Sequence, residues 1–417
     1  MPPRGRAGER KSIYDPVHGP IPLEGVALAL LSTPMFQRLW GIRQTGFAHL
    51  VFPGANHTRL EHSLGAYFVA GRMAEAIGRP PEEAETIAVA ALLHDVGHGP
   101  FSHTLDAPMQ EVLGHGHERI SRQEILGSAS RPGDHPIPAM LERGGLSPAR
   151  VAGLVDPASG AERRSLSRAL LHGPVDADRI DYLQRDAHYT GVAHGAIDAA
   201  RLLDTLETGG GRVLFAEKGR VALEGFLVGR SLMYRAVYYH KTVRAAEIML
   251  QSAVERLPGY PARARPLFGL TDGELLASLR VAGGRPAEMV DALLERRLYK
   301  RVGGRLGAAG ADRARWKKLY DSPEARRAAE SELADRIGAP EGAVLLDLSG
   351  LVARTEPREL AEIRVREGEG VARPFVGPPW EPLLTRPASP YAVAVYAAPR
   401  WRRAAAQKVG RALEGLT

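Results

Sequence analysis

The chain has 417 residues and not one of them is cysteine. Without cysteine there are no disulfides, no thiolate metal sites and no cysteine nucleophile, so a metal site has to use histidine and carboxylate ligands. The sequence also lacks the run of ~20 apolar residues that a membrane helix needs, and its start, MPPRGRAGERKS, has no apolar segment typical of a signal peptide. We therefore expect a globular, cytoplasmic protein with no membrane partner.

A modest excess of positive charge is the next feature of the composition. The formal net charge is +7, from 55 basic and 48 acidic residues, which favours polyanionic partners such as nucleotides or nucleic acids. Because a charge run alone identifies no partner, the charge is compatible with nucleic acid but does not require it. Part of the excess lies near the two ends of the sequence, at Arg4, Arg6, Arg10, Lys11, Arg400, Arg402, Arg403, Lys408 and Arg411.

Apolar residues recur at helical spacing over most of residues 12–250, which predicts a mainly α fold. The clearest helix is TRLEHSLGAYFVAGRMAEAIG, where Thr58 and Glu61 form a capping box at its start. A second helix opens after Pro80 and Pro81 and runs through the apolar segment TIAVAALLHD. With 44% hydrophobic residues, the chain is long enough for one large or two ordinary cores.

The rest of the chain predicts smaller elements of mixed type. RVLFAEKGRVAL predicts a β-hairpin around Lys218 and Gly219, and AVLLDLSG and YAVAVYAA predict short strands. The Pro-rich segment VARPFVGPPWEPLLTRPASP predicts a loop, and WRRAAAQKVGRALEGL a closing amphipathic helix. We therefore expect a basic tail at 1–11, a helical core at 12–250, a helical extension at 251–335 and a small α+β region at 336–417.

A cluster of titratable side chains follows the second helix, in the segment ALLHDVGHGPFSH. The apolar helix delivers His94 and Asp95 at its end, and His98 follows one turn later. Burying such groups without partners would cost several kcal/mol, and a divalent metal is one partner that neutralises them. A lone His-Asp pair is, however, more often a hydrogen-bonded histidine than a metal site.

Further metal ligands are available elsewhere in the sequence. His62 lies on the helix that follows the capping box, and Asp178 lies in VDADRIDYLQRD. Asp178, Tyr182 and Asp186 recur at i, i+4 and i+8, so they form one stripe on a helix. Such a stripe is either a solvated charged face or a wall that meets a sugar hydroxyl and a metal.

Taken in order, seven segments resemble the HD-domain superfamily of metal-dependent phosphohydrolases, and within it the deoxynucleoside triphosphate (dNTP) triphosphohydrolases. The resemblance covers residues 14–241, with a weaker match in ERRLYKRV at 295–302, and none that we can use beyond about residue 305. The segments are YDPVHGPIPL, TPMFQRLWGIRQTG, VFPGANHTRLEHSLG, LLHDVGHGPFSH, HE at 117 and 118, VDADRIDYLQRD and YRAVYYHK.

The resemblance implies an HD-domain helical core with a small β-hairpin and an α+β C-terminal region. It also implies that a divalent ion (Fe, Mn, Zn or Mg) is held by His62, His94, Asp95 and Asp178. In such enzymes water attacks the α-phosphorus of a dNTP and releases deoxynucleoside and inorganic triphosphate. The catalytic histidines and their orienting carboxylate would be His98, as an α-phosphate contact, His103 and His117, as alternative proton donors, and Asp106.

The same resemblance assigns substrate contacts. Arg59, Arg179 and Arg230 would hold the triphosphate, because guanidinium groups bind phosphate oxygens in pairs. Tyr182 and Asp186 would bind the 3′ hydroxyl, Tyr238 would crowd the 2′ position and exclude ribonucleotides, and Gln44 would lie near the base.

Regulation is where the sequence departs from the family. Animal relatives read a guanine activator with an acidic residue and an arginine where this chain has Ser32 and Trp40, so guanine selectivity should be lost. Arg296 and Lys300 match activator-phosphate contacts, which leaves a regulatory nucleotide site of different specificity open. The resemblance also implies a homo-oligomer, a dimer or a tetramer.

Two other functions remain open at this point. One is a different HD phosphohydrolase, acting on nucleoside monophosphates or on cyclic or alarmone nucleotides. The combination of Arg179, Tyr182, Asp186 and Arg230 argues against it. The other is a non-catalytic sensor of nucleotides or nucleic acid that keeps the metal site without using it.

Overall fold

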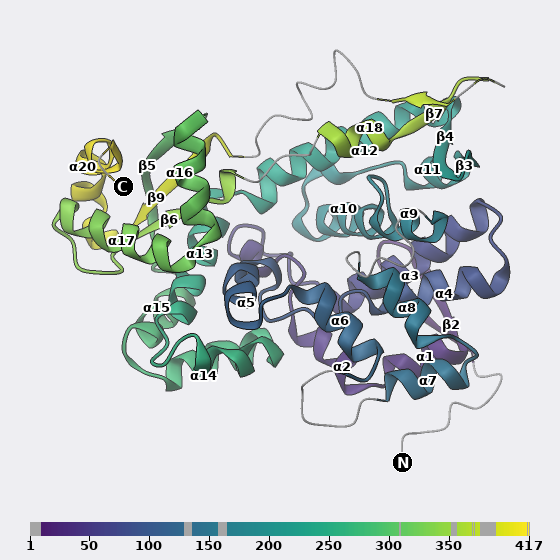
Figure 1. Cartoon of the computed structure of the whole chain (residues 1–417), viewed down its shortest axis with the longest axis horizontal. Helices are drawn as coiled ribbons and strands as arrows, with labels where there is room; N and C mark the ends of the chain where they lie inside the picture. Colours follow the sequence, from purple (N-terminus) through teal and green to yellow (C-terminus); the bar gives the residue numbers. More distant parts are fainter. Residues whose placement is uncertain are drawn as a thin grey trace.

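The computed structural model describes residues 10–128, 136–156, 165–307, 310–351, 357–368, 370, 372–375, 389–414 and 416. Helices dominate this part of the chain, as the sequence predicts, and three small sheets accompany them (Figure 1). No helix among the described residues is long and apolar enough to cross a membrane. The predicted basic tail lies outside the described residues except for Arg10 and Lys11.

The first half of the chain folds as a helical core. Its helices are α1 (Gly25–Leu31), α2 (Pro34–Arg38), α3 (Arg59–Ala76), α4 (Pro81–Leu93), α5 (Asp106–Leu113), α6 (His117–Ile125), α7 (Ile137–Arg143), α8 (Pro148–Val155), α9 (Leu166–His172), α10 (Ala177–Thr190) and α11 (Ala199–Asp204). Helix α4 is buried continuously over residues 86–93, which explains its unbroken apolar run. It packs on α3, and α3 packs on α10, so these three helices surround the predicted ligands.

A hairpin that the sequence reasoning did not predict precedes α1. Strands β1 (Arg10–Asp15) and β2 (Gly19–Glu24) pair antiparallel, and Ile21 and Leu23 of β2 are fully buried in the main core. In the turn, His18 contacts Asp181 of α10 at 2.6 Å, and its ring lies 5.4 Å from the Phe68 ring of α3, so the turn touches both helices.

The second half adds further helices and a π-helical turn. The helices are α12 (Arg220–Met233), α13 (Lys241–Glu255), α14 (Asp272–Val281), α15 (Gly284–Leu294), α16 (Gly310–Asp321), α17 (Pro323–Ile337), α18 (Pro357–Glu362) and α20 (Arg402–Glu414). The π-helical turn, Tyr234–Tyr238, continues α12. Such single π turns are frequent at functional sites.

The predicted hairpin around Lys218 and Gly219 is wrong, because the hairpin lies earlier in the sequence. The hairpin joins β3 (Leu206–Gly209) to β4 (Arg212–Ala216), and its turn is Gly210-Gly211, both with positive φ. A two-residue hairpin turn needs positive φ at both positions, which glycine adopts without strain. Lys218 and Gly219 instead lie in a short 3-10 turn that leads into α12.

In the described part of the chain, the second sheet has three strands, and one of its faces packs on a second hydrophobic core. Strand β9 (Tyr391–Ala397) lies between β5 (Lys300–Leu306) and β6 (Val344–Asp347), antiparallel to both. Along β9 alternate residues face different clusters, since Val393 and Val395 pack with α16, α17 and α20 whereas Tyr396 packs with the main core. Both faces of the sheet are therefore covered, as its apolar strands require.

Among the described residues, the third sheet has four strands and joins residues 206–216 to residues 364–374. Strand β7 (Arg364–Arg366) pairs parallel with β4 and antiparallel with β8 (Arg373–Pro374), which is part of the predicted Pro-rich loop. Most of that loop lies outside the described residues. The predicted unit boundaries at 250 and 335 stay predictions, although β5, from the predicted helical extension, belongs to the sheet of β6 and β9.

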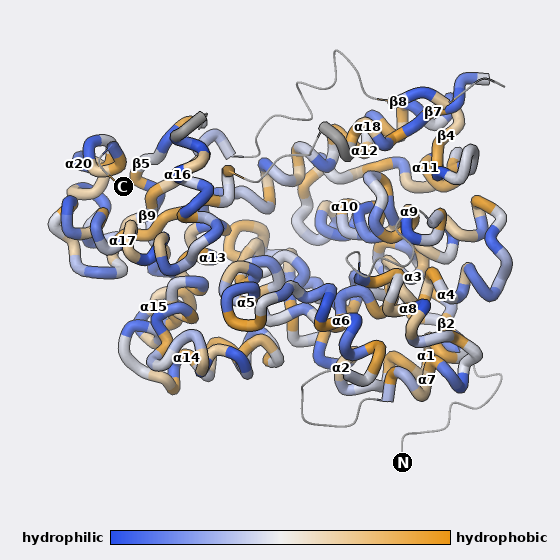
Figure 2. The backbone as a smooth tube through the Cα atoms, viewed as in Figure 1, coloured by the Kyte–Doolittle hydropathy of each residue, from blue (hydrophilic) through white to orange (hydrophobic). Residues whose placement is uncertain are grey.

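Along most helices hydrophilic and hydrophobic residues alternate at short intervals, as expected of elements with one buried face (Figure 2). The last helix of the chain, α20, follows this rule: Ala405, Val409, Ala412 and Leu413 are buried against the second core. The predicted closing helix is thereby confirmed.

Two glycines of α3 provide a matched test of close packing. A Cβ on Gly65 would lie 1.8 Å from Asp181 Oδ1 and 2.4 Å from Arg185 Nη2, whereas one on Gly71 would meet Ala88 Cβ at an ordinary 3.8 Å. We expect Gly65→Ala to destabilise the protein by about 1–3 kcal/mol. Gly71→Ala should stabilise it by up to about 1 kcal/mol, because alanine is the better helix former. Urea unfolding of both variants checks this, and equal effects would contradict it.

Candidate metal centre and substrate cavity

The start of α3 is fixed by the predicted capping box. The Glu61 carboxylate accepts hydrogen bonds from the Thr58 backbone N–H at 2.6 Å and the Thr58 hydroxyl at 2.9 Å. This cap places Arg59 in the first turn and His62 one turn further, both almost fully buried. A local sequence motif thereby sets the position of two site residues.

The turn after α4 carries His94 and Asp95 and is held by α6. The Ser121 hydroxyl donates to the His94 carbonyl at 2.6 Å and accepts from the Gly97 N–H at 2.9 Å. Gly97 is required there, because a Cβ would lie 2.4 Å from the His117 carbonyl oxygen. The close approach of α6 brings His117 beside the turn.

Helix α10 supplies the third side of the site. Its N-cap residue, Asp176, accepts a hydrogen bond from the Arg179 N–H at 2.8 Å. The predicted stripe of Asp178, Tyr182 and Asp186 follows on the face that borders the cavity described below.

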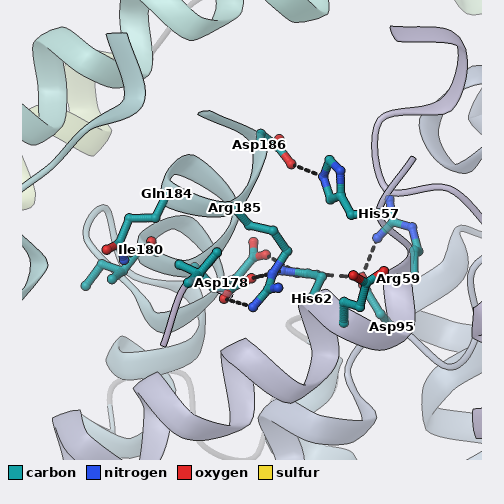
Figure 3. Close-up of polar contacts among 12 residues, drawn as sticks. His57, Arg59, His62, Asp95, Asp178, Ile180, Gln184, Arg185 and Asp186 are labelled. Carbon is teal, nitrogen blue, oxygen red and sulfur yellow. Dashed lines mark hydrogen bonds and ion pairs between the residues drawn. The ribbon is translucent and has the colours of Figure 1, made fainter. Parts of the chain in front are cut away.

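The four predicted metal ligands converge between these elements. His62 Nε2 lies 2.9 Å from Asp178 Oδ1 and 3.8 Å from Asp95 Oδ2. His94 Nε2 lies 3.2 Å from Asp95 Oδ1 and 3.8 Å from Asp178 Oδ1. Figure 3 shows His62, Asp95 and Asp178 meeting from three different elements.

The orientation of both imidazoles suits a metal ion. His62 Nδ1 donates to Asp181 Oδ2 at 2.7 Å and His94 Nδ1 donates to the Ala91 carbonyl at 2.6 Å, so each Nε2 faces the cluster. Among the described residues, the buried His62 Nε2 has no aligned hydrogen-bond partner, although Asp178 Oδ1 is near. Two imidazoles and two carboxylates thus fit a divalent ion such as Mn, Fe or Zn.

The charges of the cluster are those of a cation site. Although burial opposes ionisation, Arg59 and His94 hold the pKa of Asp95 well below its usual range. The pKa of Asp178 is also held well below its usual range, because the nearby imidazoles of His62 and His94 outweigh burial. Burial acts against a charged His62, but Asp178 and Asp181 raise the pKa of His62 to about 10. Metal uptake must therefore displace a proton.

A cavity of about 530 Å³ opens beside the cluster, which is within the usual range for small-molecule sites. Three of the metal-ligand candidates, His94, Asp95 and Asp178, lie on its wall. The wall also contains most of the other residues that the resemblance assigns: Gln44, Arg59, His98, His103, Asp106, His117, Tyr182, Asp186 and Tyr238.

Two of the predicted phosphate contacts, Arg179 and Arg230, are not among the residues that line the cavity. The Arg179 guanidinium instead contacts the Gly173 carbonyl and the Asp176 carboxylate. Arg230 is buried, and its guanidinium lies 5.8 Å from the Tyr234 ring. Their predicted contact with triphosphate stays a prediction.

Three histidines of the cavity wall differ in protonation. His98 and His117 are stacked with ring centroids 3.6 Å apart, and burial, with Arg59 acting on His98 and His98 acting on His117, holds both pKa values well below normal. His103 differs because the Asp106 carboxylate, 3.0 Å away, raises the pKa of His103 and outweighs the opposing desolvation by the cavity wall. Of these three histidines, His103 is therefore the one whose protonated form is favoured.

The Asp186 carboxylate joins two rings of the cavity region. It accepts hydrogen bonds from the Tyr238 hydroxyl and from His57 Nε2, the latter at 2.7 Å. The Tyr182 ring lies 6.3 Å from the Tyr238 ring. His57 was not singled out from the sequence, although it belongs to the matched segment VFPGANHTRLEHSLG.

The loop between His98 and His103 has a strained backbone. Phe101 and Ser102 both have left-handed backbone angles, with φ of 54° and 50°. Asp272 holds the loop through the Phe101 N–H at 2.6 Å, and Ser102 accepts from Arg59 Nε at 2.6 Å. Strain that is held in place by such bonds is common at functional sites.

Sequence reasoning also missed the far wall of the cavity. Residues from the C-terminal half line it: Tyr320, Pro323, Arg326, Leu346, Asp347, Leu348 and Ser349. Asp347 is tied to α13 by a bidentate ion pair with Arg244, at 2.9 and 3.2 Å. This wall comes from residues beyond about 305, where no resemblance guided the analysis.

Comparison with known families agrees with the site. The HD domain matches residues 59–186, and the HD associated region matches residues 197–372. The first range contains all four predicted metal ligands. The second reaches into the C-terminal half and includes the residues of the far cavity wall.

Curated relatives match part of their own length. An uncharacterized protein of Methanocaldococcus jannaschii is 37% identical over 297 residues, which are 70% of this chain and 59% of that protein. The deoxynucleoside triphosphate triphosphohydrolase SAMHD1 of Gallus gallus is 30% identical over 292 residues, 61% of this chain and 46% of that protein. The chain thus spans less than two thirds of the length of both relatives.

Solved structures match almost the whole fold. The crystal structure of a phosphohydrolase from Bacteroides thetaiotaomicron has a TM-score of 0.69 and 25% identity, covering 94% of this chain and 100% of that one. A hypothetical protein from Aquifex aeolicus has a TM-score of 0.70 and 27% identity, covering 96% and 100%.

Removal of one ligand tests the metal centre. We expect His94→Ala to lose bound divalent metal, because it removes a ligand and leaves Asp95 and Asp178 facing each other. The matched control is His188→Ala, which changes an exposed histidine of α10. Metal content after dialysis against Mn²⁺, measured by mass spectrometry, decides. Equal metal content in the two variants would refute the assigned centre.

Proposed function

Starting from a chain that is an HD-domain protein with an HD associated region, we propose that it is a metal-dependent phosphohydrolase of deoxynucleoside triphosphates. The observation that carries the proposal is the convergence of His62, His94 and Asp178, with Asp95 beside His94, next to a cavity. The name of the SAMHD1 relative supports the choice of substrate. The products are deoxynucleoside and inorganic triphosphate.

The metal would supply a nucleophilic water and polarise the α-phosphoryl group. The chain's own contribution is to position the substrate around that point. Arg59 lies on the cavity wall, and its buried guanidinium pairs with Asp95. There it would bind the phosphate groups of the substrate. His98, neutral and adjacent to Asp95, is suited to donate a hydrogen bond to an α-phosphoryl oxygen.

The sugar end is supported by the hydrogen-bonded group around Asp186. Because His57 and Tyr238 donate hydrogen bonds to it, the Asp186 carboxylate is held in one orientation. Its oxygens can accept a further hydrogen bond, which suits a 3′ hydroxyl donor. Tyr238 is held by the π-helical turn, so its ring is a rigid obstacle at the neighbouring 2′ position. This arrangement favours a deoxyribose over a ribose.

Departure of the nucleoside requires a proton at its 5′ oxygen. We assign that proton to His103 rather than His117, because Asp106 raises the pKa of His103 whereas the pKa of His117 is held well below its usual range. Both His103 and Asp106 are partly exposed, with 68% and 47% of their side chains accessible, so the proton is replenished from solvent.

For regulation, we propose that hydrolysis does not require GTP. Trp40 is 54% exposed and Ser32 follows α1, and neither side chain carries a charge that pairs with guanine or phosphate. Arg296, which donates to the Leu50 carbonyl at 2.9 Å, and Lys300, which begins β5, would bind the phosphates of a regulatory nucleotide of different selectivity. A homo-oligomer remains part of the proposal.

Product analysis tests the reaction. Incubation of the Mn²⁺-loaded protein with dATP should release deoxyadenosine and inorganic triphosphate, seen by chromatography and phosphorus NMR. The His94→Ala variant is the control for a contaminating hydrolase. Formation of dAMP with pyrophosphate, or of dADP with phosphate, would show that a different bond is cleaved.

The pH profile tests the role of Asp106. The carboxylate raises the pKa of His103, so the imidazolium persists to higher pH in the natural protein. Asp106→Asn removes that effect, and the alkaline limb of kcat should move to lower pH while metal content stays the same. Glu118→Gln, a neighbouring carboxylate near His117, is the control. An unmoved alkaline limb in Asp106→Asn would exclude His103 as the acid.

A further inference from the structure

A buried carboxylate behind the metal centre receives four hydrogen bonds. Asp181 is fully buried, and its Oδ2 accepts from His62 Nδ1 at 2.7 Å and from Arg185 Nε at 2.9 Å. Its Oδ1 accepts from His18 Nε2 at 2.6 Å and from Arg185 Nη2 at 2.9 Å. Both oxygens are therefore fully used, and only one of the four bonds goes to a metal-ligand candidate.

The remaining bonds of this network lead to the turn between β1 and β2. Arg185 Nη1 donates to Asp15 Oδ2 at 2.7 Å. Asp15 Oδ1 in turn accepts from the backbone N–H groups of Val17 and His18, both at 2.9 Å. The turn that presents His18 is thus folded around Asp15, and the same side chain ties it to α10 through Arg185.

We propose that His18 and Asp181 are positioning residues of the metal centre, and that the β1–β2 hairpin acts through them to hold the ligand His62. The inference rests on the proposed assignment of His62 as a ligand. Asp181 fixes the His62 tautomer that bears its proton on Nδ1 and therefore directs Nε2 at the metal. His18 and Arg185 fix Asp181 in the rotamer that makes this bond.

The packing around Asp181 supports a positioning role rather than general stabilisation. Gly65 of α3 leaves the space in which the Asp181 and Arg185 side chains meet, since a Cβ there would overlap both. His18 is 163 residues from Asp181 in the chain, and its side chain is only 7% exposed. The hairpin thus brings a donor to one specific carboxylate oxygen from a distant part of the sequence.

The test measures metal affinity, not activity. Loss of outer hydrogen bonds around a metal ligand typically weakens metal binding 10- to 100-fold. We expect His18→Ala to raise the dissociation constant for Mn²⁺ within that range, measured by competition with a chromophoric chelator. His18→Gln should recover most of the affinity, because its amide N–H₂ reaches Asp181 Oδ1 in place of Nε2. Tyr14→Ala, which changes an 83% exposed side chain of the same hairpin, should bind Mn²⁺ like the natural chain.

Thermal unfolding of the metal-free variants separates positioning from stability. If His18→Ala binds Mn²⁺ as the natural protein does, the inference is overturned. It is also overturned if Leu23→Ala, which destabilises the same hairpin at a fully buried residue, lowers the metal-free melting temperature and the Mn²⁺ affinity as much as His18→Ala does, because His18 would then serve the fold alone. A natural protein that binds no Mn²⁺, or a His94→Ala variant that binds it fully, would instead refute the proposed metal centre itself.

Discussion

Everything at this site follows from the burial of carboxylates that stay ionised. Asp95 and Asp181 are almost completely removed from water, and an isolated charge in such surroundings would cost several kcal/mol. A guanidinium group balances the charge of each carboxylate, since Arg59 pairs with Asp95 and Arg185 pairs with Asp181. The Arg59–Asp95 pair joins α3 to the turn after α4, and the hydrogen bond from His62 to Asp181 joins α3 to α10. The charges of Asp95, Asp178 and the two imidazoles meet at one point, which suits a divalent cation once the His62 proton is displaced.

The same principle gives similar side chains different properties within a few ångströms. His98, His103 and His117 lie in one group of rings, yet only the pKa of His103 is raised, by the Asp106 carboxylate. Burial disfavours the charged form of the other two, and Arg59 repels a charged His98 while His98 repels a charged His117. A chain that needs a neutral donor and a charged acid in one cavity obtains both by placing a single aspartate, Asp106, beside one ring.

How much of this was predictable depends on how local the determinants are. The capping box of Thr58 and Glu61 and the apolar run of α4 are local patterns, so the helices that carry His62, His94 and Asp95 follow from the sequence. His57 pairs with Asp186 across 129 residues and His18 with Asp181 across 163, and no nearby pattern marks either partner. The hairpin was misplaced because Lys218-Gly219 and Gly210-Gly211 both resemble turns, and only the pairing of β3 with β4 distinguishes them. The cavity contacts expected of Arg179 and Arg230 came from family resemblance, which does not report that Asp176 and Gly173 engage the Arg179 side chain.

The cavity has two walls of separate origin. One holds the metal-ligand candidates, and the other is built from residues 320–349 and tied to α13 through the Arg244–Asp347 pair. Substitutions, insertions or deletions in the second wall change the shape of the chamber without touching a metal ligand or the network behind it. Changes in this half of the chain can therefore alter which molecules fit the cavity while the candidate metal centre stays the same. The ion pair from Arg244 to Asp347 is what holds this adjustable wall in place on α13.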